Sequence, residues 1–513
     1  LRAVKAATTN PAVCSPAIIN QTIPVNMIYT CNNPTMCQAG NLATLNSTPI
    51  SSGASVVSLG FDANGSVPIT VRYDDAGQIT LNAGTTVTPF SGATGIFLTG
   101  SSNAFVVAPH HFGFSNITAA PIKAGKNFAA TVTAYNGLGT PSVTKNFGKE
   151  TSPESVTLFF NKYQPTGGGS VNGIFSGNTG TFNNGVATAS NLNWSEVGII
   201  DLTATLTSGN YLGSGLTATG TTGITGAVGK FIPNHFNTAV TQGCSVGGFT
   251  YSGQPFRVTV TAMNGLATPT KTVNYDGSLS TAPNFSKTVT LSDVSGIAGS
   301  LAPVTVAANS FSAGVANATP TFTFTAMPTA PATIKLRAVD TDSVSSATGT
   351  EGTALIRSGR LQFANGYGSE LMDLALPLTA QYWNGSNWIT NIADSCTTIA
   401  TANLAFTFPA AANNKLAACE TAVTLTGSAP NFLATLKAPN AGNNGWTDVA
   451  VNLDGAASGG QCTEVGGAGA AAITAAQPWL RYNGTGSVAN PVARANFGVY
   501  KGNARQIYFR ELY

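Results

Sequence analysis

The 513-residue chain is poor in charged residues and in histidine, and it has no long apolar run. Charged side chains make up 8% of the residues, against roughly a quarter in ordinary soluble domains. Three histidines are present, no Cys-x-x-Cys motif occurs, and no apolar run reaches the roughly 18 residues of a membrane span. These absences exclude a charge-rich disordered tail, a coiled coil, a membrane-spanning helix and a zinc site with the usual spacing.

The few charges are balanced and scattered along the chain. A net charge of +3 arises from 23 basic and 20 acidic residues, and no Lys/Arg cluster is present that could neutralise a row of phosphates. We therefore expect no nucleic-acid partner and no membrane span in this chain. The chain starts at Leu1 without a basic and apolar leader, so we expect a mature, processed or truncated product.

The seven cysteines form one cluster near each end of the chain, with Cys244 alone between them. Because histidine is scarce, disulfides in an exported protein explain them better than metal binding. We expect two or more disulfides, although the spacing leaves the pairing open. The count is odd, so at least one thiol is free, bridges two chains or has lost its partner. The disulfide candidates are Cys14, Cys31, Cys37, Cys396, Cys419 and Cys462.

Hydrophobicity alternates with a period of two almost throughout the chain. Segments 128–133 and 334–339 are examples, Thr and Val often alternate, and Gly, Asn and Pro interrupt the segments every several residues. Beta-branched residues suit a pleated surface, and Gly and Asn supply turns. Only the Ala-rich stretch at 468–476 could hold a short helix. The sequence predicts an all-β chain.

An internal repeat organises the middle of the chain. Segments 128–141 and 256–269 share the pattern Phe-x-x-Thr-Val-Thr-Ala-x-Asn-Gly-Leu-x-Thr-Pro, and the match continues to Asn146 and Asn274. Upstream, 109–112 matches 233–236. A similar closing strand follows in each part, and it is found at 77–81, 198–202 and 332–336. Short strands separated by turns, repeated in this way, are typical of immunoglobulin-like β-sandwiches.

We therefore predict tandem immunoglobulin-like sandwiches followed by a distinct C-terminal domain with a β-sandwich or jelly-roll-like fold. Residues 1–107 contain an extended segment and a divergent or partial sandwich, 108–231 the first repeat and 232–355 the second. Residues 356–513 break the repeat and hold four of the five tryptophans. The fifth, Trp194, precedes a closing strand and is expected in a core.

Several ordered motifs in the C-terminal part carry a family resemblance. They lie at 359–370, 376–378, 381–385, 394–397, 478–482, 493–500 and 507–511, and are preceded by 231–236, Cys244 and 249–256. Together they resemble the C-terminal domain, with its preceding sandwich, of MshQ-like proteins of the mannose-sensitive haemagglutinin type IV pilus biogenesis cluster. The resemblance implies an exported bacterial surface protein associated with pili or adhesion. It brings no catalytic residue.

Residues able to support catalysis are few. His111 and His235 occupy equivalent places in the two repeats, which favours packing over catalysis, and His110 is expected at the surface. No carboxylate pair is placed as a glycosidase needs, and no Gly-rich segment follows a parallel strand and opens a helix. Asp340 and Asp342 follow a strand, where either a calcium site or a solvated turn is expected. We predict no enzymatic activity and no cofactor.

The aromatic residues of the C-terminal domain allow two interpretations. They could stack against the apolar faces of sugars, or they could fill a core and a contact between domains, which we favour. The candidates for a ligand platform are Tyr382, Trp383, Trp388, Trp479 and Tyr482.

Low charge removes the usual protection against association of strand edges. The favoured function is a pilus-associated stalk or adhesin at the bacterial cell surface, outside the cell. The alternative is a filament subunit that inserts residues 1–47 or 506–513 into a neighbouring copy. The second alternative is a carbohydrate-binding module in the C-terminal domain. The partners are other copies of the chain, pilus or surface components, or surface glycans.

Overall fold

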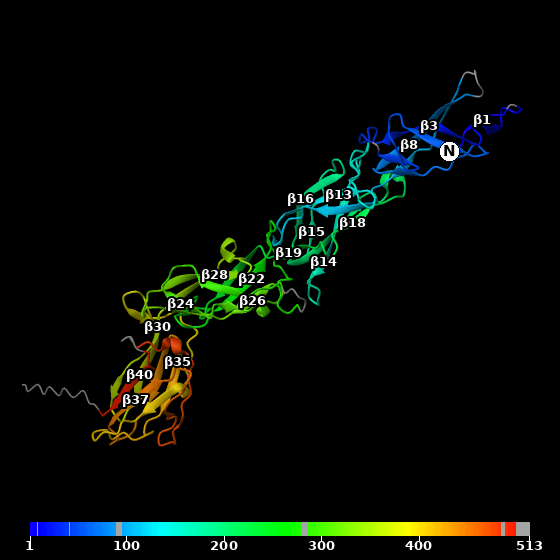
Figure 1. The fold of residues 1–513 in the computed structure, drawn as a ribbon. Coiled ribbons are helices and arrows are strands. Elements are labelled where there is room, and N and C mark those ends of the chain that lie inside the picture. Colours follow the sequence, from blue (N-terminus) through cyan, green and yellow to red (C-terminus); the bar gives the residue numbers. More distant parts are fainter. Residues whose placement is uncertain (8, 41, 89–94, 280–284, 484–487, 499–513) are drawn as a thin grey trace, which may run out of the picture. The chain divides into compact units, whose positions relative to one another are not determined.

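The computed structural model describes residues 1–7, 9–40, 42–88, 95–279, 285–483 and 488–498, and in them the chain is all-β, as predicted (Figure 1). The helices among these residues are five 3-10 turns of three residues each, and none is long and apolar enough to cross a membrane. The Ala-rich stretch at 468–476 contains β39 (Ala470–Ala471) and no helix, because so short a segment does not nucleate one without packing support. The proposed inserting segment 506–513 lies outside the described residues.

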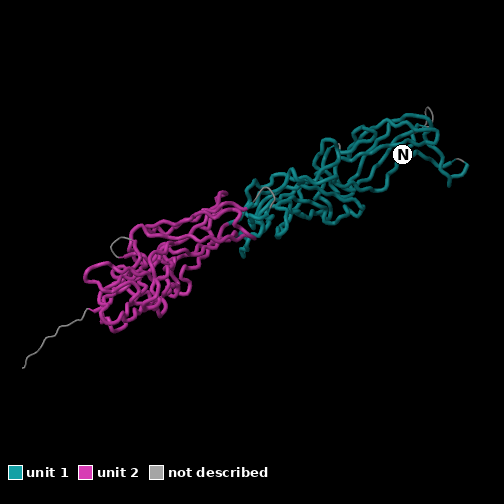
Figure 2. The backbone as a smooth tube through the Cα atoms, turned by 90° about the horizontal axis from the view of Figure 1, so that it is seen from below, with its two compact units in different colours: residues 1–234, 263–285 teal, residues 235–262, 286–513 magenta. Residues whose placement is uncertain are grey.

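The chain divides into two compact units, which Figure 2 colours separately. Unit 1 contains residues 1–234 and the loop 263–285, and unit 2 contains residues 235–262 and 286–513. The loop 263–285 connects β22 (Arg257–Met263) with β23 (Val289–Asp293). The second repeat is therefore divided, since its strands belong to unit 2 and this loop belongs to unit 1.

The N-terminal part of unit 1 is a sandwich with one core. Its larger sheet has the order β10 (Phe105–Val107), β8 (Gly77–Val87), β3 (Gln21–Asn33) and β6 (Val56–Phe61), with β9 (Ile96–Ser101) also paired to β8. Its smaller sheet has the order β5 (Thr48–Ile50), β4 (Ala43–Leu45) and β7 (Val71–Tyr73). Alternate residues of these strands, among them Met27, Leu45, Leu59 and Ile79, form the shared core. The strand β3 is internal, because it pairs with β8 on one side and β6 on the other.

The first repeat forms a nine-stranded sheet around a separate core. Its order is β12 (Ile122–Lys123), β19 (Val228–Ile232), β17 (Gly198–Leu206), β18 (Thr219–Thr221), β11 (His111–Ser115), β13 (Phe128–Tyr135), β16 (Val186–Trp194) and β15 (Phe175–Ser176), with β14 (Val156–Gln164) paired to β17. Trp194 lies fully buried in this core, as expected from its place before a closing strand.

The repeated sequence motifs occupy equivalent strands in the two repeats. In the first repeat β13 lies between β11 and β16, and in the second β22 lies between β20 (His235–Thr241) and β26 (Val315–Ala318). The closing strand β17 pairs with β14, and its counterpart β28 (Ala332–Asp340) pairs with β23. The matching segments therefore adopt matching topology.

The C-terminal part of unit 2 contains two sheets over one core. The first has the order β30 (Gly359–Phe363), β32 (Leu374–Trp383), β36 (Asn431–Leu436) and β35 (Val423–Ser428), with β33 (Trp388–Thr390) also on β32. The second has the order β31 (Gly366–Gly368), β40 (Val492–Phe497), β37 (Gly445–Val451), β34 (Leu404–Thr407), β38 (Gly460–Gln461) and β39. Residues from both sheets, including Leu376, Ala434, Val449 and Ala495, form the core.

Two closing strands of unit 1 begin with a glycine that another backbone approaches closely. A Cβ on Gly77 would lie 2.7 Å from the carbonyl oxygen of Asn33, and φ at Gly77 is +136°. The equivalent Gly198 has φ of +145°, and the carbonyl oxygen of Gln164 would lie 2.2 Å from its Cβ. Only glycine accepts both this backbone conformation and this contact without strain.

We predict that Gly198→Ala lowers the free energy of unfolding of unit 1 by about 2–4 kcal/mol, because it adds backbone strain and overpacking together. Gly209→Ala is the control, since Gly209 also has positive φ but no neighbour within 4 Å, and it should cost about 1 kcal/mol. Native-state hydrogen exchange of β17 peptides measures both changes. Equal losses in the two variants would contradict the role assigned to the close approach.

Candidate functional site

Three of the five candidate platform residues pack against each other in the C-terminal domain. The ring centroids of Trp383 and Trp388 are 5.7 Å apart, and those of Trp388 and Tyr482 are 5.5 Å apart. The guanidinium of Arg360 covers Trp388 at 4.5 Å from the ring centroid. Tyr482 donates a hydrogen bond to the carbonyl oxygen of Met327 (3.2 Å). These rings therefore form a stack that holds one arginine.

The other two candidates, Tyr382 and Trp479, pack against the hydrophobic core of unit 2. The guanidinium of Arg357 lies 4.5 Å from the ring centroid of Tyr382 and 4.7 Å from that of Phe249. All five candidates are half-buried. This packing favours a core and domain-contact role for Tyr382 and Trp479, and sugar stacking on the whole group stays a prediction.

The expectation of at least two disulfides is confirmed, since three form. Their Cα–Cα distances are 5.9, 5.4 and 5.2 Å, and they join Cys31 with Cys37, Cys244 with Cys396, and Cys419 with Cys462. Cys244, which was left out of the candidates, is thus bonded. Cys14 is exposed and free, in contrast to its place among the candidates. It lies in β2 (Cys14–Pro16), which pairs with β1 (Val4–Ala6), and no partner cysteine lies in either strand.

The histidines lie at the starts of equivalent strands. His111 opens β11 and stacks on Tyr135 with ring centroids 5.4 Å apart, and its Nδ1 lies 3.1 Å from Nδ1 of His110. Burial, together with the neighbouring His110, lowers the pKa of His111. His235 opens β20 and is buried. These positions favour the packing role that the repeat predicts.

The carboxylate of Asp340 stabilises a turn. Its Oδ1 accepts hydrogen bonds from the backbone N–H groups of Asp342 and Val344, both at 2.9 Å. In the part of the chain that the structure describes, one group of three side chains has the spacing of metal ligands, and it consists of Cys244, Asp394 and Cys396. The two sulfur atoms of this group are bonded to each other, so neither is available as a thiolate ligand.

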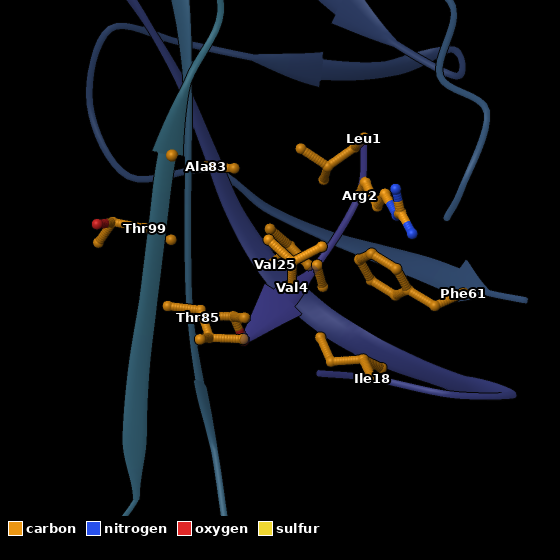
Figure 3. A pocket seen from close by; sticks show the side chains of 13 residues that line it. Leu1, Arg2, Val4, Ile18, Val25, Phe61, Ala83, Thr85 and Thr99 are labelled. Carbon is orange, nitrogen blue, oxygen red and sulfur yellow. The ribbon is translucent and has the colours of Figure 1, made fainter. Parts of the chain in front are cut away.

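The N-terminal sandwich contains a small apolar cavity (Figure 3). Its volume is about 120 Å³, and Leu1, Val4 and Ile18 face Ala83 and Thr99 across it. Small-molecule sites usually have volumes of roughly 300–1,000 Å³, so this cavity is too small for a substrate.

The strongest polar cluster of unit 1 lies where the N-terminal sandwich meets the first repeat. Asp75, which precedes β8, is 3% exposed. Its Oδ1 accepts hydrogen bonds from the backbone N–H of Asn146 (3.0 Å) and from its neighbour Ala76 (2.8 Å). The side-chain amide of Asn146 donates to Tyr73 (3.0 Å) and to the carbonyl oxygen of Ala76 (3.1 Å). Its oxygen accepts from the backbone N–H of Gln38 (2.7 Å).

A second asparagine completes this contact. The side-chain amide of Asn136 donates to the carbonyl oxygen of Asp74 (2.9 Å), and its oxygen accepts from the N–H of Ser142 (2.9 Å) in its own loop. Asn136 and Asn146 are both buried. We call these contacts the first joint: a buried carboxylate before a closing strand, joined to two asparagines of the next repeat.

The same arrangement occurs a second time in unit 1, around Glu196. Its carboxylate, 4% exposed, accepts hydrogen bonds from the backbone N–H groups of Val273 (2.9 Å) and Asn274 (3.0 Å) in the loop 263–285. The side chain of Asn274 bonds both backbone groups of Val171, donating at 2.9 Å and accepting at 2.8 Å. Asn264 donates to the carbonyl oxygen of Ser195 (3.1 Å). These contacts form the second joint.

The two joints use the same positions of the repeat. Asn136 and Asn264 are equivalent in the repeated segment, as are Asn146 and Asn274. Each acid lies two residues before the glycine of a closing strand, at Asp75 and Glu196. The internal repeat therefore pointed to the asparagines of the joints, although the sequence did not reveal their hydrogen-bond partners.

Unit 2 contains a third joint, between the second repeat and the C-terminal domain. The hydroxyl of Tyr251 donates to Asp394 Oδ2 (2.8 Å) and accepts from Asn391 (2.7 Å). Asp394 Oδ1 accepts from the backbone N–H groups of Cys396 (3.0 Å) and Thr397 (2.9 Å). Burial, with the nearby Asp394, raises the pKa of Tyr251. The disulfide of Cys396 to Cys244 adds a covalent link to the same joint.

We predict that Asn274→Ala loosens the second joint. The substitution leaves both backbone groups of Val171 without their partner, and loss of each such hydrogen bond costs about 0.5–1.5 kcal/mol. The N–H groups of Val273 and Asn274 should exchange with deuterium at least tenfold faster than in the parent protein. Asn161→Ala, at an exposed position of β14, is the control and should leave these rates unchanged. Unaltered exchange in Asn274→Ala would refute the joint.

The first joint should respond to pH through Asp75. Burial raises its pKa from 3.8 to about 6, an effect that the N–H donors, Lys149 and Lys145 only partly offset. The folded protein thus binds this proton more tightly than the unfolded chain, so the stabilising contribution is complete below about pH 4 and is lost as the pH rises through 6. A shift of about two pKa units corresponds to about 3 kcal/mol.

We therefore predict that Asp75→Asn flattens the pH dependence of unit 1 stability between pH 4 and pH 7.5. At pH 7.5 the variant should unfold at higher urea concentration than the parent protein, because an amide cannot ionise, whereas near pH 4 the two should be closer. Urea unfolding at four pH values in this range measures the difference. Parallel profiles of the two proteins would show that Asp75 does not titrate in the joint.

Several solved structures are similar to this chain. An I9–I11 tandem from titin matches it over 75% of this chain and 99% of that one (7% identity, TM-score 0.20). The chain also matches the adhesin InvE of Yersinia pseudotuberculosis (15% identity, 47% of this chain and 58% of that one, TM-score 0.19). A third match is the N-terminal eight Ig domains of Down Syndrome Cell Adhesion Molecule (10% identity, 84% and 53%, TM-score 0.18). No curated protein matches.

These TM-scores are too low to support an argument about function. Family profiles match the chain far more directly. Residues 1–101 match the first Ig-like domain of DUF6701, residues 196–359 its third domain and residues 357–512 its fourth domain. Together the three matches cover most of the chain, and they agree with its all-β, Ig-like fold. The chain belongs to the DUF6701 family.

Proposed function

We propose that this chain is an extracellular structural protein of a bacterial surface, a pilus-associated stalk or adhesin built of tandem Ig-like modules. The observation that carries the proposal is the repeated joint. In unit 1, Asp75 accepts one backbone N–H group from a loop of the next repeat, and Glu196 accepts two. A protein that transmits force or holds a terminal domain away from a surface needs such fixed connections. A flexible linker without buried contacts would not provide them.

The chemistry of the chain supports a location outside the cell. Disulfides persist in oxidising compartments, and six of the seven cysteines are bonded. One of these bonds, between Cys244 and Cys396, spans the third joint. The low content of charge suits association through hydrogen bonds and apolar contacts, which salt affects little. The motifs that resemble MshQ-like proteins connect this structural role with a type IV pilus.

The alternative, a filament built by strand insertion, receives less support. Residues 1–47 include β3, an internal strand with neighbours on both sides. Donation of this segment to another copy would remove the middle of the sheet and expose Met27 and Tyr29, which are buried. We therefore favour partners that the assembled domains contact from outside, such as pilus components or surface glycans, over exchange of this strand.

Immunogold electron microscopy on the bacterium that encodes the chain tests the proposal. Antibodies raised against the first repeat should label intact cells, and a strain without type IV pili should lose most of this label. Permeabilised cells serve as the control for total protein. Label that appears only after permeabilisation would exclude the extracellular role, and unchanged label without pili would exclude the pilus association.

A further inference from the structure

The C-terminal domain contains a cavity beside the edge strand β30. Its volume is about 340 Å³, and it is lined by residues of β30, by Tyr482 and Asn483, and by residues 489–492. This volume lies within the roughly 300–1,000 Å³ of small-molecule sites. The polar side chains of its lining include those of Arg360, Gln362 and Tyr482. Among its lining residues, Arg360 is the one that carries a charge.

The strand itself directs Arg360 and Gln362 toward the same side. Burial alternates along β30, since Gly359, Leu361 and Phe363 are buried while Arg360 and Gln362 are half-buried. Arg360 is held in place by Trp388, 4.5 Å below its guanidinium, and by a hydrogen bond from Nε to Gln381 (2.9 Å). The aromatic stack therefore fixes the orientation of a guanidinium at the wall of the cavity.

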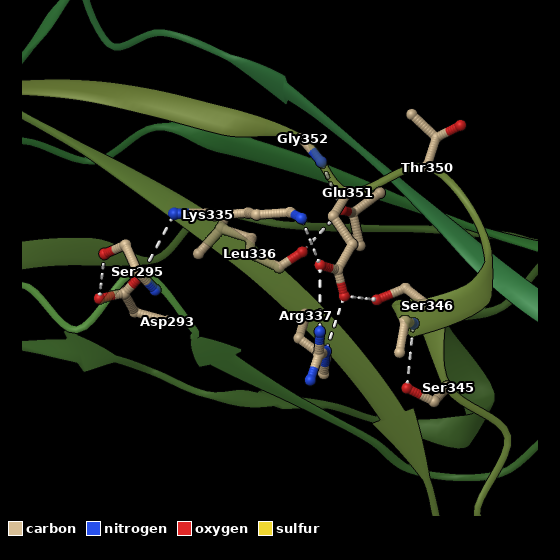
Figure 4. Close-up of polar contacts among 12 residues, drawn as sticks. Asp293, Ser295, Lys335, Leu336, Arg337, Ser345, Ser346, Thr350, Glu351 and Gly352 are labelled. Carbon is tan, nitrogen blue, oxygen red and sulfur yellow. Dashed lines mark hydrogen bonds and ion pairs between the residues drawn. The ribbon is translucent and has the colours of Figure 1, made fainter.

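Some arginines of unit 2 are neutralised by a carboxylate, whereas Arg357 bonds Asn391 and lies over aromatic rings. Arg337 bonds the carboxylate of Glu351 through Nε (2.7 Å) and Nη2 (3.3 Å), as Figure 4 shows. Arg494 bonds Asp448 in the same two-fold manner (2.7 and 2.9 Å). Among the described residues, no carboxylate pairs with Arg360 in this way. Its Nε donates a hydrogen bond to the side-chain oxygen of Gln381. Its two terminal nitrogens are left for another acceptor.

A half-buried cation without a counter-ion is costly, and burial lowers the pKa of Arg360. An anion that enters the cavity would remove this cost. The planar fork of a guanidinium matches a carboxylate with two parallel hydrogen bonds. The side-chain amide of Gln362 makes no hydrogen bond in the described part of the chain. This amide and the hydroxyl of Tyr482 are suited to bind hydroxyl groups of a ligand.

We propose that this cavity binds a saccharide unit that carries a carboxylate, such as a uronic or sialic acid of a surface polysaccharide. Arg360 receives the carboxylate, and Gln362 and Tyr482 bind the hydroxyl groups of the ring. A single cation with neutral polar neighbours fits one carboxylate on an otherwise neutral sugar better than a multiply charged phosphate. The proposal goes beyond the stalk role and does not depend on it.

Calorimetric titration of the full chain tests this site. Glucuronate, galacturonate and N-acetylneuraminate are the acidic probes, and glucose, galactose and inorganic phosphate are the matched comparisons. At least one acidic sugar should bind about tenfold or more tightly than its neutral counterpart and than phosphate, as a charge-assisted pair requires. Equal binding of the neutral sugar, or tighter binding of phosphate, would overturn the proposal.

Substitutions then locate the binding. Arg360→Gln should abolish detectable binding, and Arg360→Lys should weaken it about tenfold because the charge remains while the fork is lost. Arg494→Gln is the matched control, since Arg494 lies in the same domain but already pairs with Asp448, and it should bind like the parent. Gln362→Ala should weaken binding without altering the melting temperature, which keeps the test valid if Arg360→Gln unfolds the domain.

The free edge of β30 offers one competing explanation, since its outer backbone groups could pair with an extended peptide. An acidic and a neutral peptide of equal length are therefore titrated in parallel. Peptide binding tighter than that of every acidic sugar, or sugar binding that survives Arg360→Gln, would replace the proposed saccharide site with a strand-addition site or with a different surface.

Discussion

A carboxylate removed from water must find donors, and in this chain the donors belong to the next domain. Asp75 and Glu196 are almost fully buried, yet no arginine or lysine forms an ion pair with either one among the described residues. Backbone N–H groups donate hydrogen bonds to both carboxylates instead. Loss of the contact would leave a buried charge without its hydrogen bonds, at a cost of about 1–3 kcal/mol or more. Within unit 1, these hydrogen bonds therefore connect the acids before the closing strands with loops of the next repeat.

The position of the joint within the repeat explains how it can recur. The acid stands just before a closing strand, where the chain leaves one sandwich, and the asparagines stand in a loop of the following one. The first repeat thus carries both halves of a joint, with Asn136 and Asn146 in one loop and Glu196 before its closing strand. Duplication of this repeat would bring both halves with it, so repetition of the domain would also repeat the connection. Asn146 and Asn274, both fully buried, belong to the half of the joint that the internal sequence repeat reveals.

The sequence predicted the strands well because their signal is local. Alternation of Thr and Val indicated the all-β fold, and the repeated pattern indicated that β13 and β22 would be equivalent. Long-range pairings were different: Cys244 and Cys396 are 152 residues apart, and only the folded joint brings them together. The acidic half of the joint was equally hidden, because Asp75 and Glu196 differ in residue type and precede the repeated segments. Arg360 lies in the motif at 359–370 that carries the family resemblance, but the sequence does not show that no carboxylate among the described residues pairs with it.

Scarcity of charge makes each buried or unpaired charge informative. In a chain with 8% charged residues, a charge inside the protein requires its own physical reason, because an uncompensated buried charge is costly. For Asp394 the reason is a joint with Tyr251, and for Glu351 it is the neutralisation of Lys335 and Arg337. Arg360 has an aromatic support but, among the described residues, no carboxylate that neutralises it. By the same logic that assigns the carboxylates to structure, its charge is directed at something outside the chain.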